Sequence, residues 1–128
     1  SFGVLHHSSS LSKCLNIIHK LMNKKTICKI MLYAKNSYKF FLMKENLLRY
    51  EAQKGVPVID FYTQTDIKKI FKKFKIINIK QDFIFPYKIR PYKKNKYEKI
   101  KHFKFMNKKV FNTLSKNLGE HLLITLKK

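Results

Sequence analysis

Ser1 to Leu5, SFGVL, is an apolar run that is followed directly by His6, His7 and three serines. An uninterrupted apolar run of this kind is typical of a strand that is buried on both faces of a parallel sheet. Such a strand needs a neighbour on each edge, and the sequence does not begin with Met. We therefore expect these residues to pair with a missing N-terminal half of the domain, which lies outside this sequence. The alternative is an ordinary frayed end.

Helix and strand patterns alternate downstream of this segment. Apolar residues recur every three or four positions from Leu11 to Met22, after serines suited to an N-cap, and predict an amphipathic helix. The β-rich stretch Thr26 to Tyr33, TICKIMLY, predicts a second buried strand that is parallel to the first. The next stretch predicts a helix over Tyr38–Tyr50, a connection at Gly55–Pro57, and a second helix that starts with a capping box at Thr63–Asp66. A strand over Lys75–Lys80 and an excursion from the sheet over Phe83–Phe105 follow. The chain then ends with a helix over Met106–Leu118, terminated by a left-handed Gly119, and a last strand over His121–Leu126.

The composition allows one domain with a hydrophobic core, because the chain has 128 residues of which 45% are hydrophobic. Its formal net charge of +22 is compatible with a polyanionic partner such as nucleic acid. However, only two of the 29 basic residues are arginine, the residue that base recognition favours, and the lysines are spread along the chain. We therefore favour a solvated lysine-rich surface, produced by AT-rich codons, over nucleic-acid binding.

The sequence also limits the possible location and metal content of the protein. No apolar run approaches the roughly 20 residues of a membrane-spanning helix, so we expect no membrane span. The spacing of Cys14 and Cys28 matches no zinc or redox motif, and the histidines show no metal-ligand spacing, so we expect no metal ion. Free thiols indicate a reducing compartment, and we expect the protein to be cytoplasmic.

Several segments, taken in order, resemble a known family. They are SFGVLHHSSS before a helix, a strand ending in MLYAKNS, GVPVIDFYT before a helix, then IFPY, and finally LGEHLLITLKK. Their order and spacing resemble the C-terminal half of class I S-adenosylmethionine (SAM)-dependent methyltransferases of the small-molecule, type-11-like group. The resemblance covers nearly all of the chain.

The resemblance implies an α/β fold, a partial Rossmann-like methyltransferase sheet made of its last four strands. Ser1–Leu5, Thr26–Tyr33 and Lys75–Lys80 would be the fourth, fifth and sixth strands. The final strand, His121–Leu126, would insert antiparallel between the fifth and the sixth. Residues 1–128 would then be the C-terminal part of one methyltransferase domain, with a family-specific insertion at about 83–118, near the substrate mouth.

The sequence departs from the family pattern in three places. Ser9 stands where the group commonly has Pro, and the turn Asn23–Thr26 replaces a Lys-Pro-Gly-Gly turn. More importantly, the Gly-rich loop and the acidic ribose-binding residue of such enzymes are not among these residues, and Gly3, Gly55 and Gly119 form no such loop. We therefore expect the chain to be inactive alone, although the intact enzyme would use SAM as its cofactor.

The resemblance also indicates which residues would bind the cofactor and act on the substrate. Ser1, Phe2, Gly3 and Val4 would line the methionine side of SAM. His6 and His7 would face the transferred methyl group or the acceptor, where a neutral imidazole can serve as a general base. The alternative is that one of the two histidines only hydrogen-bonds the loop backbone.

Substrate contacts are predicted at Tyr33, Asn36, Ser37 and Tyr87, and the methyl acceptor is expected to be an unknown small molecule. Each position has a structural alternative: Tyr33 can pack the loop, Asn36 and Ser37 can cap a helix, and Tyr87 can pack beside Pro86. The competing function is a small basic protein that binds nucleic acid through Pro91–Lys104, PYKKNKYEKIKHFK, where aromatic and basic residues alternate.

Overall fold

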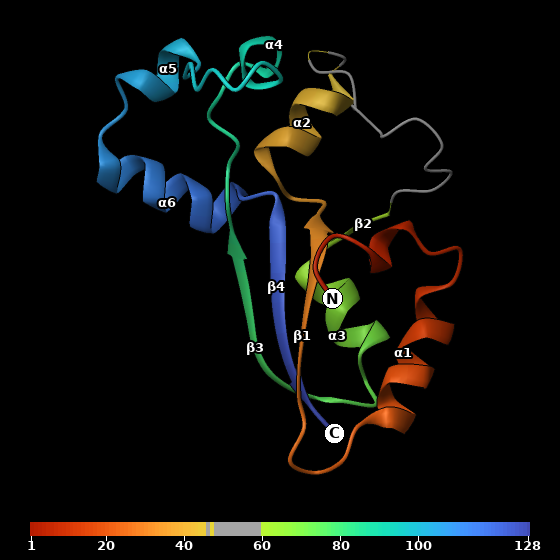
Figure 1. Ribbon diagram of the computed structural model, residues 1–128. Coiled ribbons are helices and arrows are strands. Elements are labelled where there is room, and N and C mark those ends of the chain that lie inside the picture. Colours follow the sequence, from red (N-terminus) through yellow and green to blue (C-terminus); the bar gives the residue numbers. More distant parts are fainter. Residues whose placement is uncertain (46, 48–59) are drawn as a thin grey trace.

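The computed structural model describes residues 1–45, 47 and 60–128, and it has a mixed α/β fold (Figure 1). Its four-stranded sheet contains β1 (Ile27–Ala34), β2 (Phe61–Tyr62), β3 (Lys75–Asp82) and β4 (His121–Lys127) in the order β2-β1-β4-β3. Strands β1 and β2 are parallel, whereas β4 is antiparallel to both β1 and β3. The last strand therefore lies antiparallel between β1 and β3, as predicted.

The core lies on one face of this sheet, under helices α1 (Leu11–Leu21) and α3 (Gln64–Ile70). Leu122, Ile124 and Leu126 alternate along β4 and point into the core, as the two-residue period of a strand requires. The two helices are neighbours, because Lys73, just after α3, donates a hydrogen bond to Asn16 of α1 at 2.9 Å. The amphipathic pattern at Leu11 therefore correctly predicts a core-covering helix.

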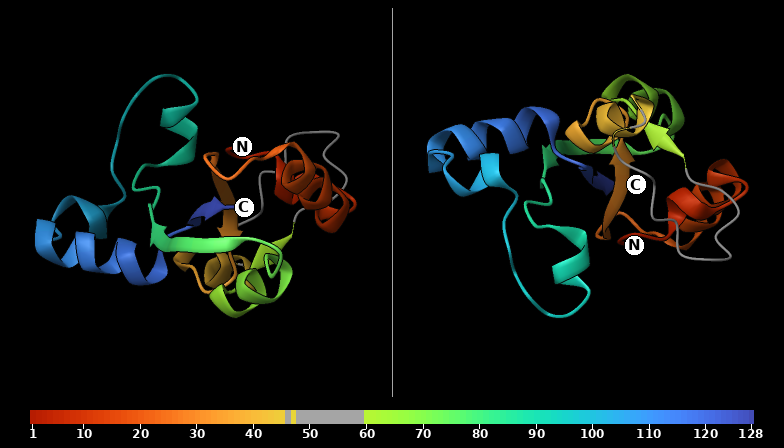
Figure 2. Two further views of the ribbon diagram at one scale, coloured as in Figure 1. Left: turned by 90° about the horizontal axis from the view of Figure 1, so that it is seen from below. Right: turned by 90° about the horizontal axis from the view of Figure 1, so that it is seen from above.

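The remaining helices gather beyond one end of the sheet. They are α2 (Tyr38–Lys44), α4 (Ile89–Tyr92), α5 (Lys101–Lys104) and α6 (Lys108–Leu118). Seen along the strands, α4 to α6 lie on the side of the molecule opposite to α1 (Figure 2). The excursion that begins after β3 thus builds a separate layer above the strand ends.

The first segment is not the strand that the sequence predicts. Phe2 forms one isolated parallel bridge with Met31 of β1, and Gly3 then adopts a left-handed φ of 73°. Leu5–His7 forms a short 3-10 helix, η1. Phe2 and Val4 are 64% and 63% exposed, so the run is not buried on both faces. The prediction of a buried strand is wrong, although Phe2 does lie parallel beside β1.

Local signals explain most of the helix boundaries. The Ser10 side chain accepts a hydrogen bond from the Lys13 N–H, and Thr63 and Asp66 form the predicted capping box at the start of α3. The predicted helix over Tyr38–Tyr50 is present as α2 up to Lys44. Residues 46 and 48–50 of that prediction, and the connection at Gly55–Pro57, lie outside the described residues.

Gly119 ends α6, but it is not left-handed. Its φ is −63° and its ψ is 153°, which is extended backbone open to any residue. The glycine is needed for a different reason, because a Cβ at this position would overlap the backbone of Asp82 and of Ser115. Close packing of the end of α6 against the end of β3, not a turn conformation, requires a glycine here. None of the described helices has the length and apolar character that crossing a membrane requires.

Candidate functional site

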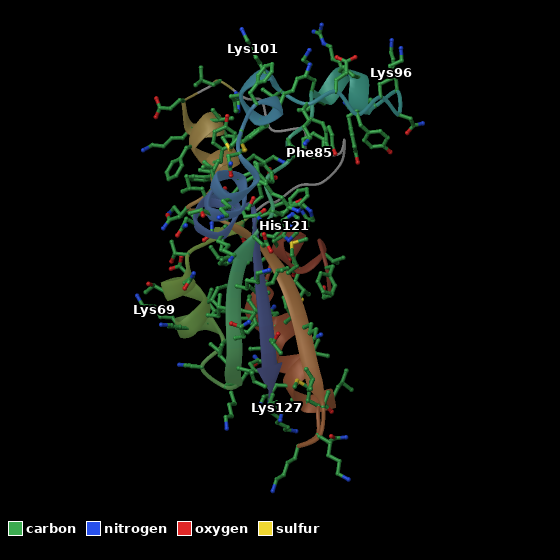
Figure 3. All side chains as sticks on the ribbon, turned by 90° about the vertical axis from the view of Figure 1, so that its left-hand side faces the viewer. Lys69, Phe85, Lys96, Lys101, His121 and Lys127 are labelled. Carbon is green, nitrogen blue, oxygen red and sulfur yellow. The ribbon has the colours of Figure 1, made fainter. Side chains whose placement is uncertain are left out.

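The carboxyl ends of β1 and β3 lie beside the amino end of β4, at the same end of the sheet. Tyr33 of β1 and Asp82 of β3 both pair with His121, the first residue of β4. Ligands of open α/β sheets bind outside the carboxyl ends of the parallel strands, so a site is expected at this end of the sheet. Figure 3 shows His121 at this end of the sheet, toward Phe85, with Lys127 at the opposite end.

An aromatic cluster lies at this end of the sheet and brings three of the predicted site residues together, His6, His7 and Tyr33. The ring of His6 lies 3.9 Å from that of Tyr33 and 4.1 Å from that of His7, between centroids. On its other side, Tyr33 is nearly parallel to His121 at 6.0 Å, and His121 stacks on Phe83 at 4.7 Å. Both histidines of η1 therefore lie against Tyr33, as their placement after the first segment suggests.

His6 has an unusual environment within this cluster. Its side chain is fully buried, and neither ring nitrogen has a hydrogen-bond partner in the described part of the chain. Burial is the main cause that lowers the pKa of His6 from 6.5 to about 4, and positive charge on His7 and His121 lowers it further. The backbone of Met31 and the carboxylate of Asp60 act in the opposite direction. His6 is therefore neutral at pH 7, and His7 is the more accessible of the two.

His121 was not among the predicted site residues. Burial lowers its pKa, and the positive charge of Lys39 adds to this effect, whereas the carboxylates of Glu120 and Asp82 oppose it. Within this row of rings, His121 is stacked between Tyr33 and Phe83, whereas His6 is tilted against Tyr33. No sequence signal distinguished His121 from an ordinary strand histidine, because its role depends on the pairing of β1, β3 and β4.

A cavity of about 430 Å³ lies next to this cluster, between α2 and the segment that contains α4. Its lining is mostly apolar: Tyr38, Leu42, Phe85, Tyr87, Ile89, Pro91 and Ile100. Tyr87, one of the predicted substrate contacts, is part of this lining. An apolar concave site with few polar groups is the usual form of a small-molecule site.

One buried ion pair lies at the boundary between the cavity and the aromatic cluster. Glu120, which is 6% exposed, accepts a hydrogen bond from the Phe85 N–H at 3.0 Å, and its other oxygen lies 3.3 Å from Lys39 Nζ. Both charged residues line the cavity and also a narrow gap that is lined by Tyr33 and Ser37. The pair therefore separates Tyr87 on one side from the cluster on the other.

The other predicted substrate contacts have clear structural roles. The Ser37 hydroxyl accepts a hydrogen bond from the Phe40 N–H at 3.2 Å and caps α2, so the capping alternative is confirmed for Ser37. The carbonyl of Asn36 accepts a hydrogen bond from Gln81 Nε2 at 2.7 Å. The same amide nitrogen donates to the carbonyl of Gly119 at 2.8 Å. These contacts hold the loops on which the cavity is built.

Of the four predicted cofactor contacts, Ser1 to Val4, the first two pair with β1 on the side away from β4. The N–H of Met31 donates to the Ser1 carbonyl at 2.9 Å, while the Phe2 and Val4 side chains are exposed. Their role as one wall of a SAM site stays a prediction of the resemblance, and the Gly-rich loop and ribose-binding carboxylate of such a site are not among residues 1–128.

Sequence reasoning also missed the charged residues of the cavity: Lys39, Lys88, Arg90 and Glu120. Glu120 carried a usable signal, because it is one of only seven acidic residues and directly precedes an apolar strand. Arg90 carried a similar signal, because it is one of only two arginines, whereas Lys39 carried none, since it is one of many lysines in a strongly basic chain. Their placement follows from the tertiary packing of α2 against the excursion.

A second concave surface is basic. This surface, the basic groove, is lined by Lys88, Tyr97, Glu98, Lys99, Lys101, Lys104 and Phe105. Tyr97 is 65% exposed and Phe105 is 75% exposed, so two aromatic rings are open to solvent among four lysines. Figure 3 shows Lys96 and Lys101 at this end of the molecule.

The described residues contain no group of three or more His, Cys, Asp or Glu side chains that could hold a metal ion. Both cysteines are free. Comparison with models of known protein families gave no match, and comparison with curated proteins gave none.

Proposed function

We propose that this chain is the C-terminal part of a SAM-dependent methyltransferase domain that acts on a small-molecule acceptor. The observation that carries the proposal is the arrangement of the sheet around β4. This strand lies antiparallel between β1 and β3, and Phe2 lies parallel on the other side of β1. The resemblance implies this neighbour relation for the fourth to the last strand of such enzymes.

The site residues have distinct roles in this proposal. SAM supplies a methyl group on a sulfonium, which any well-placed nucleophile can attack. In this proposal His7, the less buried histidine of η1, would accept the proton of an acceptor hydroxyl or amine, while buried, neutral His6 would pack against the Tyr33 ring. Most of the rate enhancement would come from the orientation of the acceptor by the residues that line the cavity, including the Lys39–Glu120 ion pair.

The predicted SAM-binding residues, Ser1–Val4, give the first test of this proposal. We expect the 128-residue chain to bind SAM too weakly to measure by calorimetry, because one wall alone cannot enclose it. The DNA upstream of Ser1 should encode, in frame, a strand followed by a Gly-rich loop, and the longer protein should bind SAM. In that protein Gly3→Val should weaken SAM binding, since Gly3 is left-handed, whereas Lys96→Gln should not. Tight binding of SAM by the short chain, or none by the longer one, would refute the proposal.

The basic groove favours a second candidate, a nucleic-acid-binding protein. Exposed Tyr97 and Phe105 can stack on unpaired bases while the neighbouring lysines neutralise phosphates. Affinity for a generic single-stranded oligonucleotide should then fall steeply with salt, and it should fall further with Tyr97→Ala. Lys101→Gln should weaken binding more than Lys69→Gln, because Lys69 lies on α3, outside the groove. No binding at low salt, or equal effects of both lysine variants, would exclude this function.

A further inference from the structure

The apolar cavity has charged groups only at its margins, and most of them already have partners. Glu120 holds Lys39 at 3.3 Å. Lys88 lies 3.4 Å from Glu98 across the base of the excursion. Arg90, on the short helix α4, lines the same cavity and is exposed. Within the described residues it has no ion pair, so its guanidinium is available to a ligand.

The geometry of the Arg90 guanidinium indicates which kind of ligand it would bind. A guanidinium presents a planar fork of donors that matches a carboxylate in a two-point contact. A cationic ligand is disfavoured, because Glu120 is already bonded to Lys39 and to the Phe85 N–H. The walls on either side, which include Tyr38, Leu42 and Phe85, suit a flat hydrocarbon body.

We propose that this cavity binds a small aromatic or otherwise apolar carboxylic acid. Its body lies between α2 and Phe85, and its carboxylate pairs with Arg90. The role of this acid as methyl acceptor rests on the proposed function, but its binding does not. Nucleic acid is a poor occupant here, since the lining is apolar and the lysines with exposed aromatic rings lie in the separate basic groove.

Two ligands of the same shape test the proposal on the 128-residue chain. 2-Naphthoate carries the carboxylate, and 2-naphthamide is its uncharged analogue; both are titrated without SAM, with intrinsic fluorescence or calorimetry as the readout. We expect the acid to bind about fivefold more tightly than the amide, the upper range for an exposed ion pair. Arg90→Gln should reduce this ratio to about one. Lys96→Gln removes the same charge from a lysine that does not line the cavity, and it should leave the ratio unchanged.

The location is tested separately from the charge. Leu42→Phe places extra volume in the cavity and should weaken both ligands. In the unsubstituted chain, amide chemical shifts should move in α2 and α4 on addition of the acid. Equal binding of acid and amide, equal effects of the Arg90 and Lys96 variants, or shifts spread over the whole lysine surface would each overturn the proposal.

Failure of this inference and failure of the proposed function give different results. If the acid binds at Arg90 but the longer protein does not bind SAM, the binding site stands and the methyltransferase proposal is refuted. If the longer protein binds SAM but 2-naphthoate and 2-naphthamide bind equally well, the methyltransferase proposal stands and the acid-binding site is refuted.

Discussion

The burial of His6 makes a quantitative prediction about acid stability. Its folded pKa of about 4 lies below the ordinary 6.5 that it regains on unfolding. Between these two values the unfolded chain binds the extra proton, so the stability contributed by neutral His6 is complete above pH 6.5 and is lost as the pH falls toward 4. At 1.36 kcal/mol per pH unit, the full loss is about 3 kcal/mol.

The groups around His6 reinforce this direction. His7 is its neighbour in η1, and His121 of β4 faces the same cluster; both disfavour a charged His6 when they are protonated. Among the described residues, Asp60 is the one acidic group that acts on it, and its effect is smaller than that of burial. Protonation of His6 in acid should therefore open the cluster at Tyr33 rather than create a new ion pair.

The assay is urea unfolding at a series of values between about pH 7 and pH 4, for the unsubstituted chain and for His6→Phe. Phenylalanine fills the space of the imidazole and removes both unpartnered nitrogens, so at pH 7 the variant should be as stable as the parent or more stable. It should lose about 3 kcal/mol less on acidification. The residual slope would come from His121, whose pKa is also lowered by burial, and, toward pH 4, from Asp66 and Asp82, whose pKa values are lowered by hydrogen bonds from Thr63 and Lys80.

The control is His102→Phe, which removes an exposed histidine and should keep the loss attributed to His6. The reasoning is refuted if the parent and His6→Phe lose the same stability between these pH values. It is also refuted if His6→Phe is several kcal/mol less stable at pH 7, because that would mean the ring nitrogens have partners that stabilise the fold.

Three further substitutions probe the fold and the cavity floor. Thr63→Ala should cost about 1 kcal/mol in urea unfolding, because the N-cap side of the capping box is lost, while Thr63→Ser should cost much less. Gly119→Ala should cost at least about 3 kcal/mol, since its Cβ would meet backbone that cannot move aside; a loss below 1 kcal/mol would contradict this packing. Glu120→Leu should lower the free energy of unfolding by about 1–3 kcal/mol, because the Phe85 N–H loses its acceptor. Glu120→Gln keeps an acceptor and should lower it less when both variants are compared by urea unfolding.

The elements that the sequence predicts well are those whose pattern is local. The helix after Ser10, the capping box at Thr63 and the alternating strand after Gly119 each depend on neighbours within a few residues. The prediction for the opening segment is wrong, because its hydrophobic residues are exposed and the chain turns at the left-handed Gly3. β2 was not predicted at all, since a two-residue strand carries no periodicity.

The candidate site was predictable only in part, for a related reason. His6, His7 and Tyr33 could be grouped, because their positions follow two segments that were expected to be adjacent. The cavity could not be derived, because it forms between α2 and a lysine-rich excursion that lacks an apolar pattern. Lys39, Arg90 and Glu120 come from three distant stretches, and only the folded chain brings their charges around one apolar space.

The side-chain amide of Gln81 has a consequence for how this end of the protein moves. One nitrogen on β3 donates to the carbonyls of Asn36 and Gly119, so it fastens the exit of β1 and the entry of β4 to the same point. Each loop accepts its own hydrogen bond from this amide, so a movement of the Gln81 side chain releases both loops together. Hydrogen–deuterium exchange at Ser37 and Glu120 should then report a single shared fluctuation, with matching rates that a Gln81→Leu substitution would uncouple.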